Sequence, residues 1–106
     1  MLVATTENIA GHKTKQVIGQ VFGLVVRSRG LGGNIMAGLR SIVGGEIHEY
    51  TKLMAESREQ ALDRLIEHAQ SLGADAVIGL RFDATEAGAQ TPATEVLAYG
   101  TAVKLA

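Results

Sequence analysis

One segment, residues 13–29, constrains the fold more than any other part of the chain, because it is β-rich and apolar on both faces. Successive side chains of a strand point to opposite faces. One face of this segment has Val17, Gly19, Val21, Gly23 and Val25, and the other has Ile18, Gln20, Phe22, Leu24 and Val26. Gln20 is the only polar residue in that run. A strand in an ordinary two-layer domain has one wet face, so the sequence predicts that another apolar surface covers this strand.

The rest of the chain predicts one α+β domain over residues 1–106, with two layers. Further strands are expected at Leu2–Thr6, Asp75–Asp83 and Glu95–Leu105, a short helix at Ile35–Val43 and a long helix at Glu49–Leu72. In the long helix, apolar residues recur at helical spacing, and Gly73 follows in the usual position after a helix end. The expected fold is a mostly antiparallel sheet backed by one long and one short helix.

The last strand has a bulky face and a small face. The small face consists of Val96, Ala98, Gly100 and Ala102. Two helices cover only one side of such a sheet, and an apolar face left in water is a patch that monomers rarely expose. We therefore expect the small face, together with Gly19, Gly23 and Gly79, to pack against a second copy of the chain. The predicted partner is the chain itself.

Composition narrows the possible partners. The 10 basic and 11 acidic residues give a net charge of -1, which favours neither nucleic acid nor an anionic membrane surface. No apolar run approaches the roughly 20 residues of a membrane span, and the N-terminus lacks the pattern of a signal peptide. The expected location is the cytoplasm. The absence of cysteine excludes disulfides and thiolate chemistry.

A cluster before the long helix is a candidate metal site. Glu46, His48 and Glu49 offer oxygen and imidazole ligands, which suit zinc, manganese or nickel. The alternative is a solvated polar loop followed by the acidic residues that favour a helix N-terminus. Three ligands within four residues need help from elsewhere to hold one ion, and copies brought together by symmetry would supply it. No other cofactor is expected.

The glycine-rich turn at residues 30–34 is a candidate anion site. Gly32, Gly33 and Asn34 lead into the predicted short helix, where free backbone amides bind anions. Arg29 and Arg40 are close in sequence and would strengthen such a site if they converge on it. The turn lacks the Gly-Lys-Ser/Thr of a phosphate-binding loop, and a plain loop-to-helix connection is the alternative.

The chain shows no catalytic constellation. No serine has a histidine and an acid at suggestive positions, and no His-x-x-x-His pair occurs. His68 lies at the edge of the apolar face of the long helix, where a histidine more often packs and hydrogen-bonds than ligates a metal. The sequence therefore favours a non-catalytic binding or scaffold protein over an enzyme, and a metal- or anion-binding protein is the second hypothesis.

Several segments together resemble the YbjQ-like family, a bacterial family also labelled a heavy-metal-binding domain. The most specific are Leu-Gly-Ala-Asp-Ala-Val-Ile-Gly at residues 72–79 and Tyr-Gly-Thr-Ala-Val at residues 99–103. The resemblance implies a β-α-β-β arrangement, preceded by an extra hairpin strand, in a subunit that forms a ring-like homopentamer. It implies no activity and no catalytic residues. Residues 46–49 and 90–92 depart from the family pattern.

Overall fold

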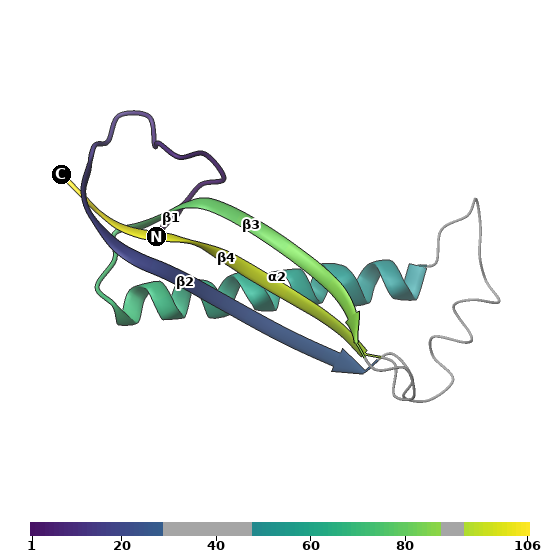
Figure 1. Cartoon of the computed structure of the whole chain (residues 1–106). Coiled ribbons are helices and arrows are strands. Elements are labelled where there is room, and N and C mark those ends of the chain that lie inside the picture. Colours follow the sequence, from purple (N-terminus) through teal and green to yellow (C-terminus); the bar gives the residue numbers. More distant parts are fainter. Residues whose placement is uncertain (29–47, 88–92) are drawn as a thin grey trace.

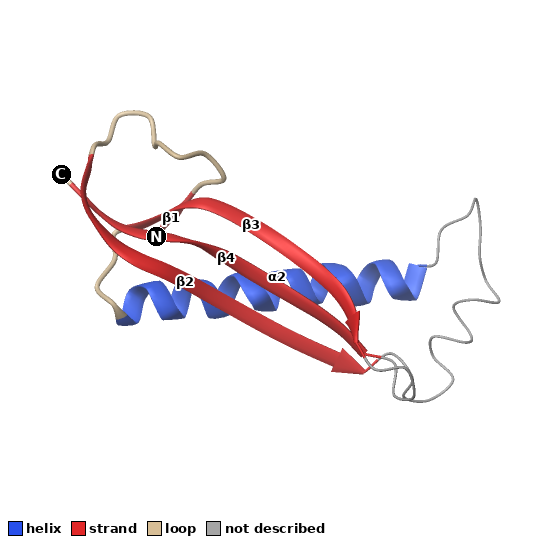
Figure 2. Cartoon of the chain, viewed as in Figure 1, coloured by secondary structure: helices blue, strands red, loops and turns tan. Residues whose placement is uncertain are grey.

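The computed structural model describes residues 1–28, 48–87 and 93–106, in which one helix packs against a four-stranded sheet (Figures 1 and 2). The elements are β1 (Leu2–Val3), β2 (Thr14–Ser28), α2 (His48–Ser71), β3 (Ala76–Ala87) and β4 (Ala93–Leu105). The strand order is β1-β3-β4-β2, with β1 parallel to β3 and the other pairs antiparallel. The predicted α+β class and mostly antiparallel sheet are confirmed. The predicted short helix at 35–43 lies outside the described residues.

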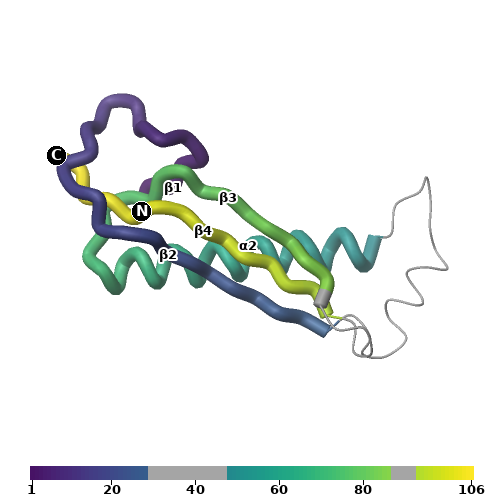
Figure 3. Tube along the Cα trace, viewed as in Figure 1, coloured from purple at the N-terminus to yellow at the C-terminus, as the bar shows by residue number. Residues whose placement is uncertain are grey.

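The long helix α2 agrees with its prediction to within one residue at each end. Its 24 residues give a length of about 36 Å, and it runs along the sheet in the direction opposite to β2 (Figure 3). Gly73 ends it with a φ of 76°, a conformation that a residue without Cβ adopts at little cost. The Gly73 and Ala74 amides donate to the carbonyls of Gln70 and Ala69 at 3.0 and 3.1 Å, which closes the last turn.

The core lies between α2 and the small residues of the sheet. Its buried members are Val21, Val25, Ala61, Leu65, Ala69, Val77, Leu80, Val96, Ala98 and Ala102. At Gly23 the helix backbone comes so close that a Cβ would lie 2.5 Å from Leu65 N and closer still to the Ala61 carbonyl oxygen. The prediction that the small face meets a second copy is therefore wrong. Small residues face α2 because they let its backbone approach the sheet.

Bulges change which side chains share a face. A bulge adds one residue to one strand and so reverses the alternation beyond it. In β2 the register shifts between Val17 and Gly19, so Val17 is 61% exposed whereas Ile18 packs against the core. In β3 it shifts between Ile78 and Arg81, so Val77 and Leu80 both join the core although simple alternation separates them.

The N-terminal strand does not form the expected hairpin with β2. It pairs with β3 at the opposite edge of the sheet. The Ala4 amide donates to Val77 O at 2.9 Å, and the Leu80 amide donates to Ala4 O at 3.0 Å. The Arg81 guanidinium donates to Thr5 O at 2.8 Å. The β3 bulge turns backbone groups toward the N-terminal segment, and residues 4–13 then lead to the other edge (Figure 1).

Strands β3 and β4 are longer than predicted. The sequence predicts a polar loop from Thr85 onward, but Thr85 pairs with Glu95 and Glu86 pairs with Thr94. Thr85 and Glu86 are exposed, whereas Thr94 is buried, and the backbone groups of a hairpin pair regardless of the side chains. The predicted loop is therefore shorter, and residues 88–92 lie outside the part described.

Candidate functional site

The sheet face turned away from α2 has an apolar stripe along β2 and β4. Residues directly opposite each other in a sheet share a face, and Phe22 lies opposite Tyr99 while Leu24 lies opposite Leu97. Phe22, Leu24, Val26 and Tyr99 are 46%, 45%, 56% and 39% exposed. We call Phe22, Leu24, Val26, Leu97 and Tyr99 the β2–β4 stripe. Contiguous exposed apolar residues of this kind mark interaction sites.

The same face becomes polar on β3. Arg81 lies opposite Tyr99, and Asp83 lies opposite Leu97; both are exposed. The prediction of a sheet that is apolar on both faces therefore holds for the middle of β2 and β4, where Glu95 and Thr101 limit the apolar part of the free face. These two strands are also the ones packed most extensively against α2 (Figure 1). The stripe thus ends at β4, and β3 forms its hydrophilic border.

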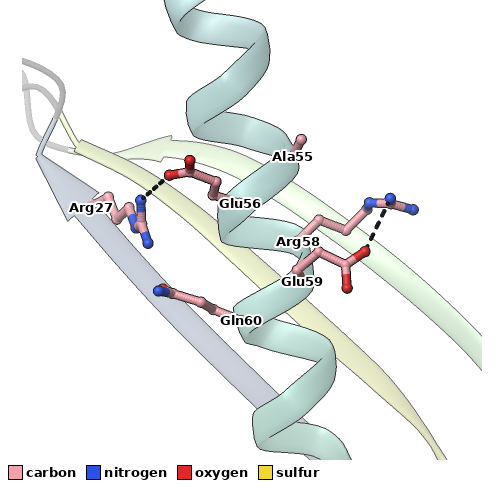
Figure 4. A pocket seen from close by; sticks show the side chains of 6 residues that line it. All are labelled: Arg27, Ala55, Glu56, Arg58, Glu59 and Gln60. Carbon is pink, nitrogen blue, oxygen red and sulfur yellow. Dashed lines mark hydrogen bonds and ion pairs between the residues drawn. The ribbon is translucent and has the colours of Figure 1, made fainter.

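A row of polar side chains on α2 follows the outer edge of β2. Its members recur every four residues, which places them on one side of the helix: they are Glu56, Gln60, Arg64 and His68. Figure 4 shows Glu56 reaching Arg27 of β2 and Gln60 on the same side of the helix. We call these four residues the α2 polar row.

Three members of the α2 polar row bind β2. Glu56 forms an ion pair with Arg27 at 3.4 Å. Arg64 Nη1 donates to the carbonyl oxygen of Leu24 at 2.5 Å. The amide of Phe22 donates to His68 Nδ1 at 3.1 Å. The hydrogen-bonding role expected for His68 is confirmed, and its partner is the backbone of the edge strand.

Among the described residues, two hollows lie beside the first half of α2. The larger, of about 410 Å³, is lined by Arg27, Ala55, Glu56, Arg58, Glu59 and Gln60 (Figure 4). Its charges are already paired, since Arg58 binds Glu59 at 3.4 Å as Arg27 binds Glu56.

The smaller hollow, of about 230 Å³, is apolar and includes Met54 and Phe82. Arg58 lies 5.9 Å from the centre of the Phe82 ring, within the range of a cation–π contact. Neither hollow brings together a nucleophile and a base.

Most of the predicted site residues lie outside the described part of the chain. These are Arg29, Gly32, Gly33, Asn34, Arg40 and Glu46. The anion site therefore stays a prediction. His48 and Glu49 are described, and they form the exposed first turn of α2, where an acidic residue is favoured by the helix dipole.

Metal ligands do not cluster in the ranges 1–28, 48–87 and 93–106. Within them, no group of three or more histidine, cysteine, aspartate or glutamate side chains is arranged to hold a metal ion. A metal site at His48 and Glu49 would need at least one further ligand from outside these ranges or from another copy.

Sequence reasoning missed the α2 polar row, although its signal was present. The four-residue spacing of Glu56, Gln60, Arg64 and His68 places them together on the helix. What the spacing does not show is that this side lies over the edge of β2.

Among the described residues, no helix has the length and apolar character needed to cross a membrane.

Comparison with known proteins agrees with the fold and gives the family. The chain is 59% identical over 102 residues to a UPF0145 protein of Bradyrhizobium sp. (strain ORS 278), covering 96% of this chain and 90% of that protein. It is 59% identical over 103 residues to a UPF0145 protein of Methanoregula boonei, covering 97% and 84%. Another relative comes from Thermoplasma volcanium, at 52% identity. Because the last two are archaea, the expected restriction to bacteria is wrong.

The fold also occurs in a solved structure of low sequence similarity. That protein, of unknown function and from the DUF74 family of Pediococcus pentosaceus, superposes with a TM-score of 0.68 at 18% identity, covering 100% of this chain and 98% of that one. The sequence model of the YbjQ family, described as "Putative heavy-metal-binding", matches residues 1–106. With these relatives, that match means that the chain belongs to the YbjQ family.

Proposed function

We propose that this protein is a non-catalytic binding or scaffold protein that works as a homo-oligomer, with five copies in a ring. The observation that supports it is the β2–β4 stripe, in which Phe22, Leu24 and Val26 are each close to half exposed. Antiparallel sheets with one free face usually put polar side chains there. A second copy that covers the stripe would remove this apolar surface from water.

Electrostatics permit such an assembly. The net charge of -1 per chain adds little repulsion between copies. The polar border on β3, with Arg81 and Asp83, would form the hydrated rim that interfaces have around an apolar centre. The number of copies comes from the family resemblance, and the cytoplasmic location stays a prediction from the sequence.

Substituting Leu24 with lysine is expected to dissociate the oligomer. A charge in the middle of a buried apolar contact costs about 2 kcal/mol or more, which weakens association roughly thirtyfold. The mass would be measured by light scattering after gel filtration at micromolar concentration. We expect five times the 11.1 kDa of one chain for the native protein and a much smaller mass for L24K.

Leu72→Lys is the matched control, because Leu72 is also 45% exposed but lies beyond the end of α2, away from the stripe. L72K should keep the mass of the native protein. A native protein that is a stable monomer would contradict the proposed function. An oligomer that L24K and L72K affect equally would contradict the role of the stripe.

A second candidate function is metal binding, favoured by the description of the family model. His48 and Glu49 begin α2, and repetition of this turn around a ring would bring several copies of the pair together. Imidazole and carboxylate ligands suit zinc, manganese or nickel. A ring is what this site would require, because the described residues of one chain do not complete it.

Calorimetric titration tests the metal site directly. Zinc, manganese and nickel would each be titrated into the native protein, His48→Ala and His12→Ala. His12 is an exposed histidine of the N-terminal turn and controls for adventitious binding. We expect heat with the native protein and with H12A, and at least a tenfold loss of affinity in H48A, since loss of a direct ligand costs at least as much as loss of an outer-shell partner. Absence of heat with the native protein retires this candidate.

A further inference from the structure

The outer edge of β2 lies beside the exposed apolar side chains of the β2–β4 stripe, a combination that natural proteins usually avoid because it favours pairing with another chain. β2 is an edge strand of 15 residues, and the unpaired backbone groups of an edge strand are a template for another strand. The other edge, β1, is only 2 residues long. A second copy that added its own β2 here would extend the sheet instead of covering its face.

Two side chains of α2 occupy the backbone of β2 at this edge. In an antiparallel pair, residues directly opposite each other either exchange both hydrogen bonds or exchange none. The Phe22 amide donates to His68 Nδ1 at 3.1 Å, so the pair of Phe22 with Tyr99 is one whose backbone groups point outward. The outward carbonyl of Leu24 accepts from Arg64 at 2.5 Å. One donor and one acceptor of the template are thus already used.

We propose that Arg64 and His68 form a latch that closes the edge of β2 to strand pairing with a second copy, and that protonation of His68 opens it. The latch deepens the proposed function and rests on it, because it directs self-association to the β2–β4 stripe and away from the edge. The strand that pairs with the opened edge is β2 of another copy, which lies alongside this one.

The chemistry of the imidazole makes the latch depend on pH. A neutral imidazole has one ring nitrogen that accepts and one that donates, whereas the charged ring has only donors. Since Nδ1 of His68 accepts from the Phe22 amide, the ring has its proton on Nε2. Histidine is the side chain that gains charge between about pH 8 and pH 5. Once charged, Nδ1–H faces the Phe22 N–H, and the hydrogen bond is lost.

The neighbouring groups do not replace this bond. On α2, Arg64 lies one turn before His68 and has the same sign of charge as a protonated imidazole. The residues of β2 on either side of Phe22 that face α2, Val21 and Gly23, are uncharged. Among the described residues, the ion pair near β2 joins Arg27 to Glu56, and no ion pair joins His68 to a carboxylate. Protonation therefore frees the Phe22 amide for another acceptor.

The test compares the native protein with His68→Gln and His12→Gln at about pH 7.5 and about pH 5.5. Glutamine has an amide oxygen that accepts at both pH values, so H68Q keeps the latch closed. His12 is exposed and serves as the matched control. Mass by light scattering and the hydrogen exchange of the Phe22 amide, corrected for its intrinsic rate, are measured for each.

At the lower pH we expect the native protein and H12Q to gain mass at least twofold and reversibly, while H68Q keeps its mass. Exchange at Phe22, measured at a protein concentration low enough that the mass does not rise at the lower pH, should accelerate about tenfold in the first two, as loss of one hydrogen bond predicts, and stay constant in H68Q. Equal behaviour of all three proteins, or no change in the native protein, would overturn the latch. A monomer at the higher pH would contradict the proposed function only, because Phe22 exchange tests the latch without any oligomer.

Discussion

Replacing Gly23 with alanine is expected to destabilise the fold by about 3 kcal/mol, at the upper end of overpacking costs. The added Cβ would meet main-chain atoms of α2, since Leu65 N lies 2.5 Å away and the Ala61 carbonyl oxygen is nearer. A side chain at this distance could rotate aside, but a helix backbone has to move as a unit. Urea unfolding followed by circular dichroism would measure the loss.

Gly79→Ala separates this contact from the backbone preference of glycine. Gly79 has a φ of 63°, and a Cβ there would meet nothing within 4 Å. Its substitution should therefore cost only the left-handed conformation, about 1 to 2 kcal/mol. If G79A proved as damaging as G23A, the close approach of α2 to β2 would not be what requires glycine at position 23.

Periodicity within the chain predicted the local elements well. The spacing of Ala61, Leu65 and Ala69 and the stop at Gly73 were sufficient to place α2, because helix formation depends on neighbours in sequence. The pairing of β1 was not predictable in this way. It depends on the bulge between Ile78 and Arg81, which presents backbone groups of β3 to the N-terminal segment, and no side-chain pattern specifies a bulge.

The identity of the buried face was mispredicted for a physical reason. In the middle of β2 and β4 both faces are apolar, so hydrophobicity alone does not decide which one meets the helix. The size of the residues does, because Gly23, Ala98 and Ala102 admit a helix backbone that Phe22 and Leu24 would hold away. The exposed stripe is thus the bulky face, whereas the small residues were expected at the contact between copies.

The candidate sites were predicted less well than the fold. His48 and Glu49 share the first turn of α2, as their spacing requires, but convergence with a third ligand depends on parts of the chain far apart in sequence. The role of His68 was predicted only as a hydrogen bond. Its partner, the Phe22 amide, lies 46 residues away, and only the packing of α2 along the edge of β2 brings them together.

Leu65→Ala is expected to destabilise the protein by about 3 to 4 kcal/mol, within the range for truncating a buried leucine. Leu65 is completely buried and is the largest of the fully buried side chains among the described residues. The backbone of α2 already contacts Gly23 of β2 at this residue, so the helix cannot settle inward to fill the space. A cavity that cannot collapse gives the larger cost.

Leu72→Ala is the control for this cavity, since Leu72 is 45% exposed and its truncation should cost less than about 1 kcal/mol. Unfolding of both variants should be followed at two protein concentrations, because association stabilises the native state by mass action. The difference between L65A and L72A should be the same at both concentrations, as Leu65 contributes to the core of a single chain. A difference that vanishes on dilution would instead place Leu65 in the contact between copies, with α2 and not the β2–β4 stripe as the surface where they meet.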